Sequence, residues 1–313
     1  MSAPNQSAPP STSTTGFRSV FRPNLFAGQT IIVTGGGSGI GRCTAHELAS
    51  LGAHTVLIGR KIDKLDRTSA ELREDCGPDC CSTYSLDIRD EDGVKRVIGK
   101  IVADRGRIHG LVNNAGGQFP SPLSAISKNG FEAVVRTNLV GGFLMAREAY
   151  NQSMQRHGGA IVNIVADMWR SMPGMGHSGA ARAGMVNFTQ TAAVEWAHSG
   201  VRVNALAPGW IISSGMDTYK GVVRDMIPML KNSVPLHRMG TESEVSAGIC
   251  FLLSEGAAFI TGSTLRVDGA APNTTAMWPL QAHDRSAAFD GFHRAETPEV
   301  LQDKSSSSKP PNE

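Results

Sequence analysis

Apolar and polar positions alternate along the chain between short β-branched runs and longer stretches with helical spacing. The short runs predict seven strands, at residues 30–33, 54–58, 83–87, 110–113, 160–165, 201–207 and 264–268. Helical stretches separate most of them, at residues 43–50, 62–74, 91–105, 131–157, 181–197 and 242–253. The pattern therefore predicts an α/β fold, with a single doubly wound parallel sheet of about seven strands and helices on both faces.

The two ends of the chain differ in composition from the alternating region between them. Ser, Thr, Pro and Ala dominate the beginning, and Ser, Pro and Lys the end, so neither buries enough apolar surface to offset ordering. We expect a disordered tail over 1–22, one α/β domain over 23–275, a C-terminal extension over 276–297 and a disordered tail over 298–313. The aromatic, His and Asp content of 278–294 suggests that the extension docks on the pocket or on a neighbouring subunit.

The overall composition limits the classes of partner. Of 313 residues, 40% are hydrophobic, which excludes an intrinsically disordered protein. The 30 basic and 28 acidic side chains give a net charge of +2, whereas a dedicated nucleic-acid binder would show a larger basic excess. No apolar run reaches the roughly 18 residues of a membrane span. The final Pro-Asn-Glu is not a peroxisomal address, so we expect a cytoplasmic protein.

Five cysteines are present, an odd number that fits free thiols in a reducing cytosol. Cys76, Cys80 and Cys81 cluster around a Gly-Pro turn and resemble part of a metal site. No histidine or further cysteine stands nearby in the sequence to complete four ligands. The sequence therefore predicts a structural role for this cluster and no bound metal.

A glycine-rich loop follows the first predicted strand and leads directly into a helix. Between Thr34 and Gly41 it contains Gly35, Gly37, Ser38, Gly39 and Ile40. Glycine permits the positive φ of a sharp turn, and the absent Cβ lets a pyrophosphate approach the backbone. The helix N-terminus beyond the loop offers unpaired N–H groups to anionic oxygens. At the start of a doubly wound pattern, this loop predicts a bound dinucleotide in a Rossmann-type fold.

The end of the second predicted strand bears on which dinucleotide is bound. An Asp or Glu there would accept hydrogen bonds from a free ribose 2′-hydroxyl and repel a 2′-phosphate. This chain has Arg60 and Lys61 instead, and a guanidinium can bind a phosphate bidentately. The sequence therefore favours NADP(H) over NAD(H). Asp87, at the end of the third predicted strand, is expected to hydrogen-bond the adenine or to cap a loop.

Several motifs in a fixed order resemble the short-chain dehydrogenase/reductase superfamily over about residues 25–270. They are the glycine loop at 34–41, Asn113-Asn114-Ala115-Gly116, Asn138 and Pro208-Gly209. The resemblance implies that Asn114, Ala115 and Gly116 lie beside the cofactor and that Pro208 and Gly209 open the stretch leading to the substrate loop. It also implies a homotetramer or homodimer in which residues 131–157 and 181–197 pack against their symmetry mates.

The chain departs from this resemblance at the family's Ser, Tyr and Lys triad. Ser178 and Arg182 stand where the family has Tyr and Lys, and the fifth strand leads into Asp167 without the family's serine. In the family, a phenol whose pKa a neighbouring cation lowers exchanges a proton with the substrate. A serine hydroxyl is too weak an acid for this, although it can donate a hydrogen bond. We therefore predict a cavity without an ionisable phenol; a proton-donating tyrosine from the 210–230 loop would contradict that prediction.

Two branches of the family resemble different parts of the chain. Residues 177–184, with 194–197 and 116–119, resemble peroxisomal trans-2-enoyl-CoA reductase. Residues 167–169, 173–177 and 284–286 look more like bacterial proteins labelled citronellol/citronellal dehydrogenase, which act in acyclic terpene breakdown. The two resemblances imply different reactions.

The candidate residues suit these reactions differently. Reduction of an unsaturated thioester leaves negative charge on the thioester oxygen, to which Ser178 could donate while Arg182 holds the nicotinamide ribose. Alcohol oxidation needs a base, for which His177 and Asp167 are the candidates. His177 could equally pack against the cofactor loop, and Asp167 could cap a helix or loop. Asn138 is expected to hold a water or a carbonyl near the active site rather than only to satisfy buried backbone groups.

Three functions follow as hypotheses. The leading one is an NADP(H)-dependent oxidoreductase that reduces a trans-2-enoyl-CoA with a lipophilic acyl chain. The others are an alcohol dehydrogenase for a branched terpenoid such as citronellol and a non-catalytic nucleotide-binding protein. The thioethers and indoles expected around the pocket suit an acyl or terpenoid chain, at Trp169, Met172, Met175, Trp210, Met216 and Met226.

Overall fold

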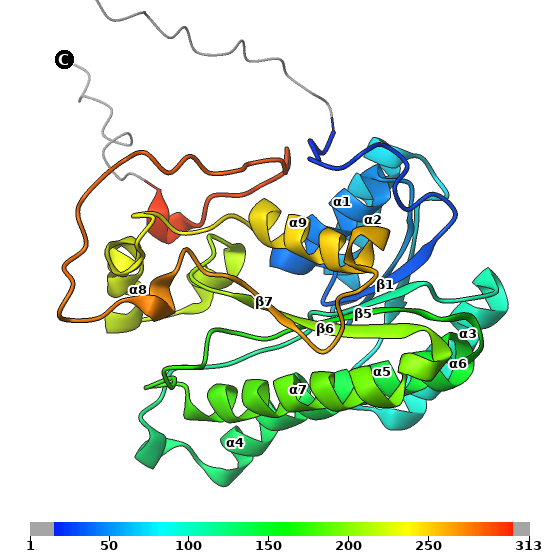
Figure 1. Ribbon diagram of the computed structural model, residues 1–313, viewed down its shortest axis with the longest axis horizontal. Coiled ribbons are helices and arrows are strands. Elements are labelled where there is room, and N and C mark those ends of the chain that lie inside the picture. Colours follow the sequence, from blue (N-terminus) through cyan, green and yellow to red (C-terminus); the bar gives the residue numbers. More distant parts are fainter. Residues whose placement is uncertain (1–15, 303–313) are drawn as a thin grey trace, which may run out of the picture.

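The computed structural model, which describes residues 16–302, contains one parallel sheet at its centre (Figure 1). Its strands are β1 (Thr30–Thr34), β2 (His54–Gly59), β3 (Cys81–Ser85), β4 (Gly110–Asn113), β5 (Gly159–Ile164), β6 (Val201–Pro208) and β7 (Thr264–Val267). They form a 7-stranded sheet in the order β3-β2-β1-β4-β5-β6-β7, and every pair is parallel. The predicted doubly wound sheet is confirmed.

Helices cover both faces of the sheet, as Figure 1 shows. One face carries α1 (Gly39–Ser50), α2 (Ile62–Cys76) and α9 (Glu242–Leu253), and the other carries α3 (Glu91–Arg105), α4 (Lys128–Val135), α5 (Gly141–Ala149), α6 (Gln155–His157) and α7 (Gly176–Glu195). Two buried apolar clusters fill the space between these layers: Leu48 and Ile249 belong to the first, and Ile98 and Met145 to the second. Removal of this apolar surface from water is the main stabilising contribution to such a fold.

Two predicted helices differ from the observed ones in ways that affect the site. The stretch 131–157 begins earlier, at Lys128, because Ser127 caps it by accepting from the Gly130 N–H. It is then interrupted by a π-helical turn at Arg136–Val140, which contains Asn138. The stretch 181–197 also begins earlier, as α7 at Gly176, so the first turn of this helix carries functional side chains.

The third strand was predicted two residues too late. β3 pairs with β2 from Cys81 to Ser85, opposite Thr55 to Gly59, and both strands end together. Asp87 therefore lies beyond the strand, in the turn that leads to α3, where its carboxylate accepts from the backbone N–H of Arg89. The polar residues after Ser85 do not by themselves show where β3 ends, because its register is set by pairing with β2.

Both predicted tails extended too far into the ordered chain. The Phe17 ring lies 5.9 Å from that of Phe292, and the Arg18 N–H donates to the Gly291 carbonyl. Glu299–Leu301 forms a 3₁₀ helix whose first N–H groups donate to the carboxylate of Asp217. Apolar and hydrogen-bonding contacts with distant residues thus order 16–22 and 298–302. The rest of both predicted tails lies outside the described residues.

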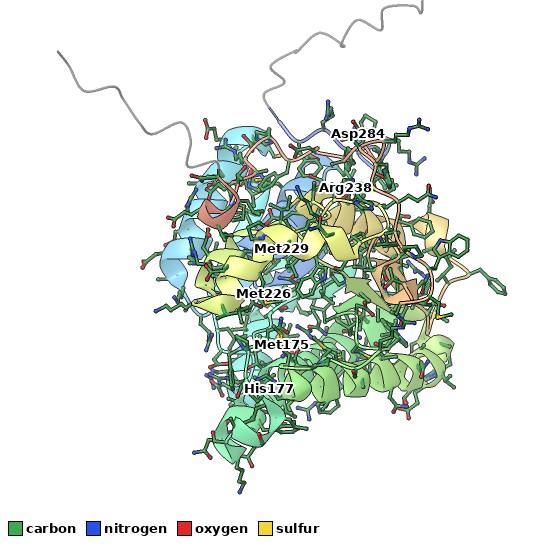
Figure 2. The ribbon with its side chains drawn as sticks, turned by 90° about the vertical axis from the view of Figure 1, so that its left-hand side faces the viewer. Met175, His177, Met226, Met229, Arg238 and Asp284 are labelled. Atoms are coloured by element: carbon green, nitrogen blue, oxygen red, sulfur yellow. The ribbon has the colours of Figure 1, made fainter. Side chains whose placement is uncertain are left out.

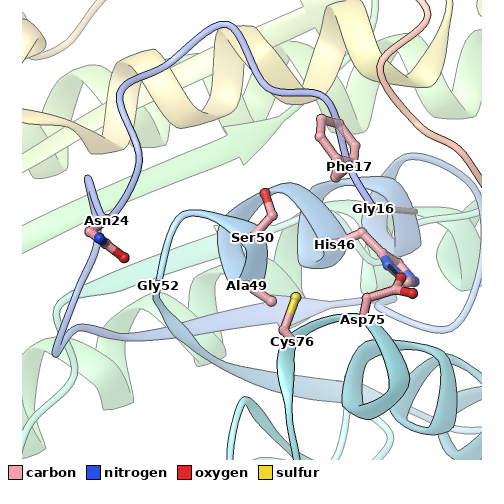
Figure 3. A pocket seen from close by; sticks show the side chains of 9 residues that line it. All are labelled: Gly16, Phe17, Asn24, His46, Ala49, Ser50, Gly52, Asp75 and Cys76. Atoms are coloured by element: carbon pink, nitrogen blue, oxygen red, sulfur yellow. Dashed lines mark ion pairs between the residues drawn. The ribbon is translucent and has the colours of Figure 1, made fainter. Parts of the chain in front are cut away.

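The C-terminal extension crosses from the α8 (Val222–Met226) end of the molecule to α1 and α2 and back (Figure 1). A charged cluster anchors it at the far end of this path. Arg294 donates to Asp75 at 2.6 Å, and His293 Nε2 lies 2.9 Å from the same carboxylate. His46 lies 3.2 Å from Asp75 and edges a hollow of about 330 Å³ beneath the N-terminal segment, shown in Figure 3. The extension therefore binds α2 of its own chain at this end, a contact that the sequence did not predict.

Three further sequence expectations concern the whole of the described chain. Between residues 16 and 302, no helix combines the length and the apolar character that a membrane crossing requires. The same part of the chain contains no group of three or more His, Cys, Asp or Glu side chains arranged to hold a metal ion. Cys76 and Cys80 pack against the buried Cys81 and the apolar side chains beneath α2, and all five cysteines are free thiols.

Candidate active site

The glycine loop turns from β1 into α1 at the point where the strand order reverses. Gly35 and Gly39 have φ values of +69° and +58°, in the region that favours glycine. A Cβ on Gly41 would overlap the carbonyl oxygen of Gly35 and lie 2.5 Å from Asn114 Nδ2. The N-cap residue Ser38 makes no side-chain capping bond, and no acidic residue stands in the first turn of α1. The loop thus presents free N–H groups at a positive helix end, which fits a pyrophosphate.

The segment after β4 is tied to the end of β1. Asn114 Nδ2 donates to the Thr34 carbonyl at 3.0 Å, and the Thr34 hydroxyl oxygen accepts from the Ala115 N–H at 2.9 Å. Asn113 donates to the Asn163 side chain at 2.9 Å, across to β5. These bonds fix the backbone beside the glycine loop, where α/β proteins of this kind bind their ligands.

A cleft of about 260 Å³ lies along these two segments. Eight of the predicted cofactor residues line it: Gly35, Ser38, Ile40, Arg60, Asp87, Asn114, Ala115 and Gly116. Gly37 and Gly39 line the adjoining hollow with Lys64 and Arg67. Lys61 is exposed and lines neither, and Gly41 lies behind the turn. The structure therefore brings most of the predicted cofactor residues together in one groove.

The adenosine end of the cleft contains a cation that the sequence analysis missed. Arg89 lines the cleft and donates to the carboxylate of Asp87. This hydrogen bonding lowers the pKa of Asp87 to about 2. Within residues 16–302, Arg60 and Lys61 form no ion pair, so the end of β2 keeps positive charge beside the cleft. No sequence motif predicts Arg89 at the cofactor cleft. Its place there becomes evident only from its pairing with Asp87 in the structure.

Ser178 lies in the first turn of α7, completely buried. Its hydroxyl donates to Gln118 Oε1 at 2.7 Å. Gln118 is a second residue that the sequence analysis missed, since 60 residues separate it from Ser178. Gln118 lies just beyond Gly116 and Gly117, so this bond joins α7 to the segment after β4.

His177 is packed inside the site. Its ring is completely buried and meets Phe119 edge-to-face, with ring centroids 4.4 Å apart. Its Nδ1 accepts from the Ser178 backbone N–H at 3.0 Å, and that N–H also donates to the Met175 carbonyl. Nε2 has no partner among the described residues. The ring therefore packs on Phe119, beyond Gln118, and not on the cofactor loop that the sequence suggested.

Arg182 lies one turn further along α7 and reaches β5. Its Nη1 donates to the Ile164 carbonyl at 2.5 Å, and its Nη2 lies beside Gly116, where a Cβ would be 2.7 Å away. Desolvation lowers the pKa of the guanidinium to about 10, so Arg182 stays cationic at neutral pH. No carboxylate pairs with it in the described part of the chain. Its charge therefore faces the cleft that Gly116 lines.

Asn138, predicted to hold a water or a carbonyl near the active site, binds the backbone of Gly117 in the structure. The side chain is only 3% exposed, and both of its polar atoms bind the backbone of Gly117. Nδ2 donates to the Gly117 carbonyl at 2.7 Å, and Oδ1 accepts from the Gly117 N–H at 2.9 Å. The π-helical turn aims the amide at this backbone, so Asn138 positions the segment that carries Gln118.

Asp167 lies after β5 but faces the end of β7. Burial raises the pKa of its carboxyl, and Asp268 raises it further, against the nearby Arg266. Its Oδ1 is buried without a hydrogen-bond partner among residues 16–302. Gly209, predicted at the cofactor site with Pro208, packs directly on Asp268 and donates to the Val267 carbonyl at 2.9 Å. Asp167 and Gly209 thus both lie against the end of β7.

A phenol that the sequence did not assign to the site lies beside Gln118. Gln118 Nε2 donates to the hydroxyl of Tyr219 at 3.3 Å. Tyr219 follows the 3₁₀ helix Ser214–Thr218, in the loop after β6. The sequence offers no reason to expect a tyrosine from this loop beside Ser178, because no local pattern links the two residues.

The predicted apolar residues divide between the mouth of the site and other places. In Figure 2, Met226 and its neighbour Met229 are labelled above Met175 and His177. Met226 and Met229 are 55% and 64% exposed. Met216, by contrast, is buried in a cluster inside the loop.

Two predicted indoles and one methionine lie elsewhere. The Trp169 ring lies under the Arg266 guanidinium at 5.4 Å. Trp210 lines a separate cavity of about 450 Å³ with residues of 234–240 and 266–270. Met172 packs near Gly179 of α7, where a Cβ would lie 3.4 Å from it.

A dinucleotide groove at the switch point, next to a helix that presents a hydroxyl and a cation, defines the chain as a nucleotide-dependent oxidoreductase. Residues 35–270 match the family model described as Enoyl-(Acyl carrier protein) reductase. The chain belongs to the short-chain dehydrogenase/reductase family, as the sequence motifs suggested, and is therefore an enzyme that uses a nicotinamide dinucleotide.

Three similar proteins place the chain within this family. A probable 2,4-dienoyl-CoA reductase of Bacillus subtilis is 36% identical over 249 residues, which cover 77% of this chain and 95% of that protein. The structure of a citronellol catabolism dehydrogenase of Pseudomonas aeruginosa PAO1 is 64% identical, with a TM-score of 0.73, covering 81% and 98% of the two chains. A gluconate 5-dehydrogenase structure from Beutenbergia cavernae, described with bound NADP, is 30% identical, with a TM-score of 0.74, over 81% and 100%.

Proposed function

We propose that the protein is an NADP(H)-dependent reductase of α,β-unsaturated acyl-CoA, with a trans-2-enoyl-CoA as substrate. The single observation that carries this proposal is the buried Ser178 hydroxyl, four residues before the Arg182 cation on α7. The pair offers a neutral hydrogen-bond donor and positive charge on α7, at the positions where the family has its Tyr and Lys. The acyl-CoA substrate of the named Bacillus relative supports the same class.

The chemistry of this substrate fits the donors. When bound, the reduced cofactor supplies a hydride to the β-carbon, and charge develops on the thioester oxygen. A hydrogen-bond donor at such an oxygen is worth about 2.7–4 kcal/mol of barrier. Arg182 lies against Gly116, which lines the cleft, and adds positive potential there without losing its own proton.

The preference for NADP(H) rests on the end of β2. Arg60 lines the cleft without an ion-pair partner in the described chain, and Arg89 neutralises Asp87. In the adjoining hollow beside Gly37, Lys64 adds a cation, whereas Arg67 is paired with Glu71 and Glu296. A guanidinium that is free of carboxylates can bind the 2′-phosphate bidentately. The neighbour described with bound NADP supports this assignment.

The test is a screen of both reduced cofactors against unsaturated acyl-CoA. Purified protein is incubated with NADPH or NADH and crotonyl-CoA, trans-2-decenoyl-CoA or a 2,4-dienoyl-CoA, and cofactor oxidation is followed by absorbance. We expect turnover with NADPH and the longer trans-2-enoyl-CoA. If NADPH binds and none of these thioesters is reduced, the proposal is wrong. The saturated or partly saturated product, identified by mass spectrometry, distinguishes enoyl from dienoyl reduction.

A second candidate is an alcohol dehydrogenase for a branched terpenoid such as citronellol. The 64% identity to the citronellol catabolism dehydrogenase favours it. Asp167 is then the candidate base, since its Oδ1 is buried without a partner in the described residues. Citronellol with NADP⁺ or NAD⁺ tests this function. The second candidate would be established over the first by two results together. The wild-type protein would oxidise citronellol and reduce no enoyl-CoA, and the citronellol activity would be lost in Asp167→Asn.

Assembly and compartment are part of the same proposal. We expect a homo-oligomer through the faces of α4, α5 and α7, on which Phe131, Phe143 and Val194 are exposed. Light scattering on the purified protein distinguishes a monomer from a dimer or tetramer. The five free thiols support a reducing compartment such as the cytoplasm.

A further inference from the structure

We propose that Tyr219 donates the proton of the reaction and that a hydrogen-bonded relay through Gln118 to Ser178 holds it in place; this inference rests on the proposed enoyl-CoA reduction. The phenol that α7 lacks is thus supplied by the loop after β6. Ser178 and Gln118 act as positioning residues for it, in addition to any contact that Ser178 makes with the substrate.

The relay has a direction that follows from its donors and acceptors. The Ser178 hydroxyl donates to Gln118 Oε1 at 2.7 Å, and Gln118 Nε2 donates to the Tyr219 hydroxyl at 3.3 Å. In this pattern Ser178 directs its proton to Gln118, whereas Tyr219 receives a hydrogen bond and keeps its own proton. Among the described residues, no acceptor takes that proton. The phenol is therefore an additional donor at the Gln118 end of the relay.

The backbone next to Gln118 is fixed, although the Gln118 side chain is exposed. Gln118 follows Gly117, whose N–H and carbonyl are both bound by the buried Asn138. Gly116, one residue earlier, lines the cleft and lies against Arg182. The relay therefore starts from the segment that borders the cofactor groove, and one amide group separates Ser178 from Tyr219.

The ring of Tyr219 is held from the other side by the loop and by the 3₁₀ helix Glu299–Leu301. It packs half-buried against the buried cluster of Met216, Ile227 and Met239. Val300 and Leu301 of this 3₁₀ helix pack on the same cluster. Asp217 accepts from the backbone N–H groups of residues 299 and 300, at 3.1 and 3.2 Å. The 3₁₀ helix after the C-terminal extension thus fixes the loop that carries the phenol.

The other tyrosines are engaged elsewhere. The chain contains three tyrosines. Tyr84 on β3 donates to Asp104, and the Tyr150 hydroxyl bonds Ser199 while its ring stacks on Trp196 at 4.4 Å. Neither contacts Gln118 or Ser178 in the described part of the chain. A phenol at the site must therefore be Tyr219.

The proton balance of the step is complete. The hydride from NADPH forms the C–H bond at the β-carbon, the C=C π bond breaks, and its electrons give the thioester enolate. The Tyr219 O–H bond then breaks, its proton forms the C–H bond at the α-carbon, and solvent water reprotonates the phenolate. The sum is enoyl-CoA, NADPH and one proton giving acyl-CoA and NADP⁺. Such a donor typically contributes 10²–10⁴-fold.

The test compares Tyr219→Phe with wild-type enzyme on trans-2-decenoyl-CoA and NADPH in D₂O. We expect kcat to fall at least tenfold, with NADPH affinity within about twofold of wild type. Deuterium should enter one face of the α-carbon in the wild-type product and both faces in the variant product, as read by NMR. Tyr84→Phe is the matched control, because it removes a phenol hydroxyl remote from the cleft and should leave both readouts unchanged.

The outcomes separate this inference from the function on which it rests. A Tyr219→Phe rate within twofold of wild type overturns the inference. A slower Tyr219→Phe variant that still places deuterium on one face of the α-carbon also overturns it, because unchanged stereochemistry indicates a structural role for Tyr219. Absence of any enoyl-CoA turnover in the wild type overturns the proposed function itself. Gln118→Leu, which breaks the relay and leaves the phenol, should slow kcat in the same direction and serves if Tyr219→Phe does not fold.

Discussion

Arg89 binds the carboxylate of Asp87 through two nitrogens, with Nη2 2.5 Å from Oδ2 and Nε 2.9 Å from Oδ1. The pair occupies the end of the cleft where the adenosine of the cofactor is expected. Because Arg89 neutralises this carboxylate, the charge of Arg60 on the neighbouring strand end is not offset by an ion pair in the described chain. The geometry therefore makes the cofactor preference depend on Arg60.

Replacement of Arg60 by Asp is expected to reverse the cofactor preference. The substitution removes the guanidinium and adds a charge that repels the 2′-phosphate, and a hydrogen bond to a charged group contributes about 1.5–3 kcal/mol. NADPH affinity should fall at least tenfold, while NADH affinity stays within about threefold. Fluorescence titration of both reduced cofactors measures this. Arg96→Asp, on an exposed arginine of α3, is the control, and equal losses for both cofactors would refute the assignment.

Gly41→Ala is expected to abolish cofactor binding. The new Cβ would overlap the Gly35 carbonyl and lie 2.5 Å from Asn114 Nδ2, so the turn must open. Overpacking of this kind typically costs about 1–3 kcal/mol of stability. Titration with NADPH and thermal unfolding measure both effects. Gly99→Ala on α3 is the matched control, because its Cβ meets only the flexible end of Gln152, and it should bind NADPH normally.

Ser178→Ala is expected to lower reductase turnover tenfold or more with cofactor affinity nearly unchanged. The substitution removes a donor beside the developing charge and leaves Gln118 Oε1 without its hydrogen bond. Steady-state kinetics with trans-2-decenoyl-CoA and an NADPH titration measure the two quantities. Thr191→Ala on the exposed side of the same helix should keep full activity. An unchanged rate in Ser178→Ala would remove this residue from the mechanism.

The sequence was sufficient for the sheet and the cofactor groove because both depend on local patterns. Alternating strands and helices determine the layers, and glycines such as Gly41 are required wherever backbone segments approach closely. Strand ends were less accurate: Asp87 lies two residues beyond β3, since pairing with β2 sets where that strand stops.

The polar contacts of the site could not be derived in the same way. Gln118 meets Ser178 across 60 residues and Tyr219 across 101, and no spacing rule connects such positions. Asn138 was assigned a ligand role because an amide beside an active site often has one. Only the three-dimensional structure shows that both ends of this amide are used by Gly117.

The stability of the fold should depend on pH through Glu242, at the start of α9 beside the glycine loop. Burial raises the pKa of this carboxyl to about 7, Arg42 opposes the shift, and Glu296 of the extension adds to it. Below the unfolded value, near 4.5, the residue is neutral in both states, and its contribution to stability is fully present. As the pH rises towards 7, the unfolded state loses its proton first, so this contribution is lost.

Glu242→Gln removes this titration and keeps the shape of the side chain. Relative to wild type, the variant should therefore gain stability as the pH rises from about 5 to about 8, by on the order of 2 kcal/mol. Urea unfolding of both proteins at the two pH values measures the difference. Glu255→Gln, on an exposed carboxylate paired with Arg22, is the control and should show no such trend. A constant difference between Glu242→Gln and wild type across this range would mean that Glu242 is already ionised in the folded protein at about pH 5.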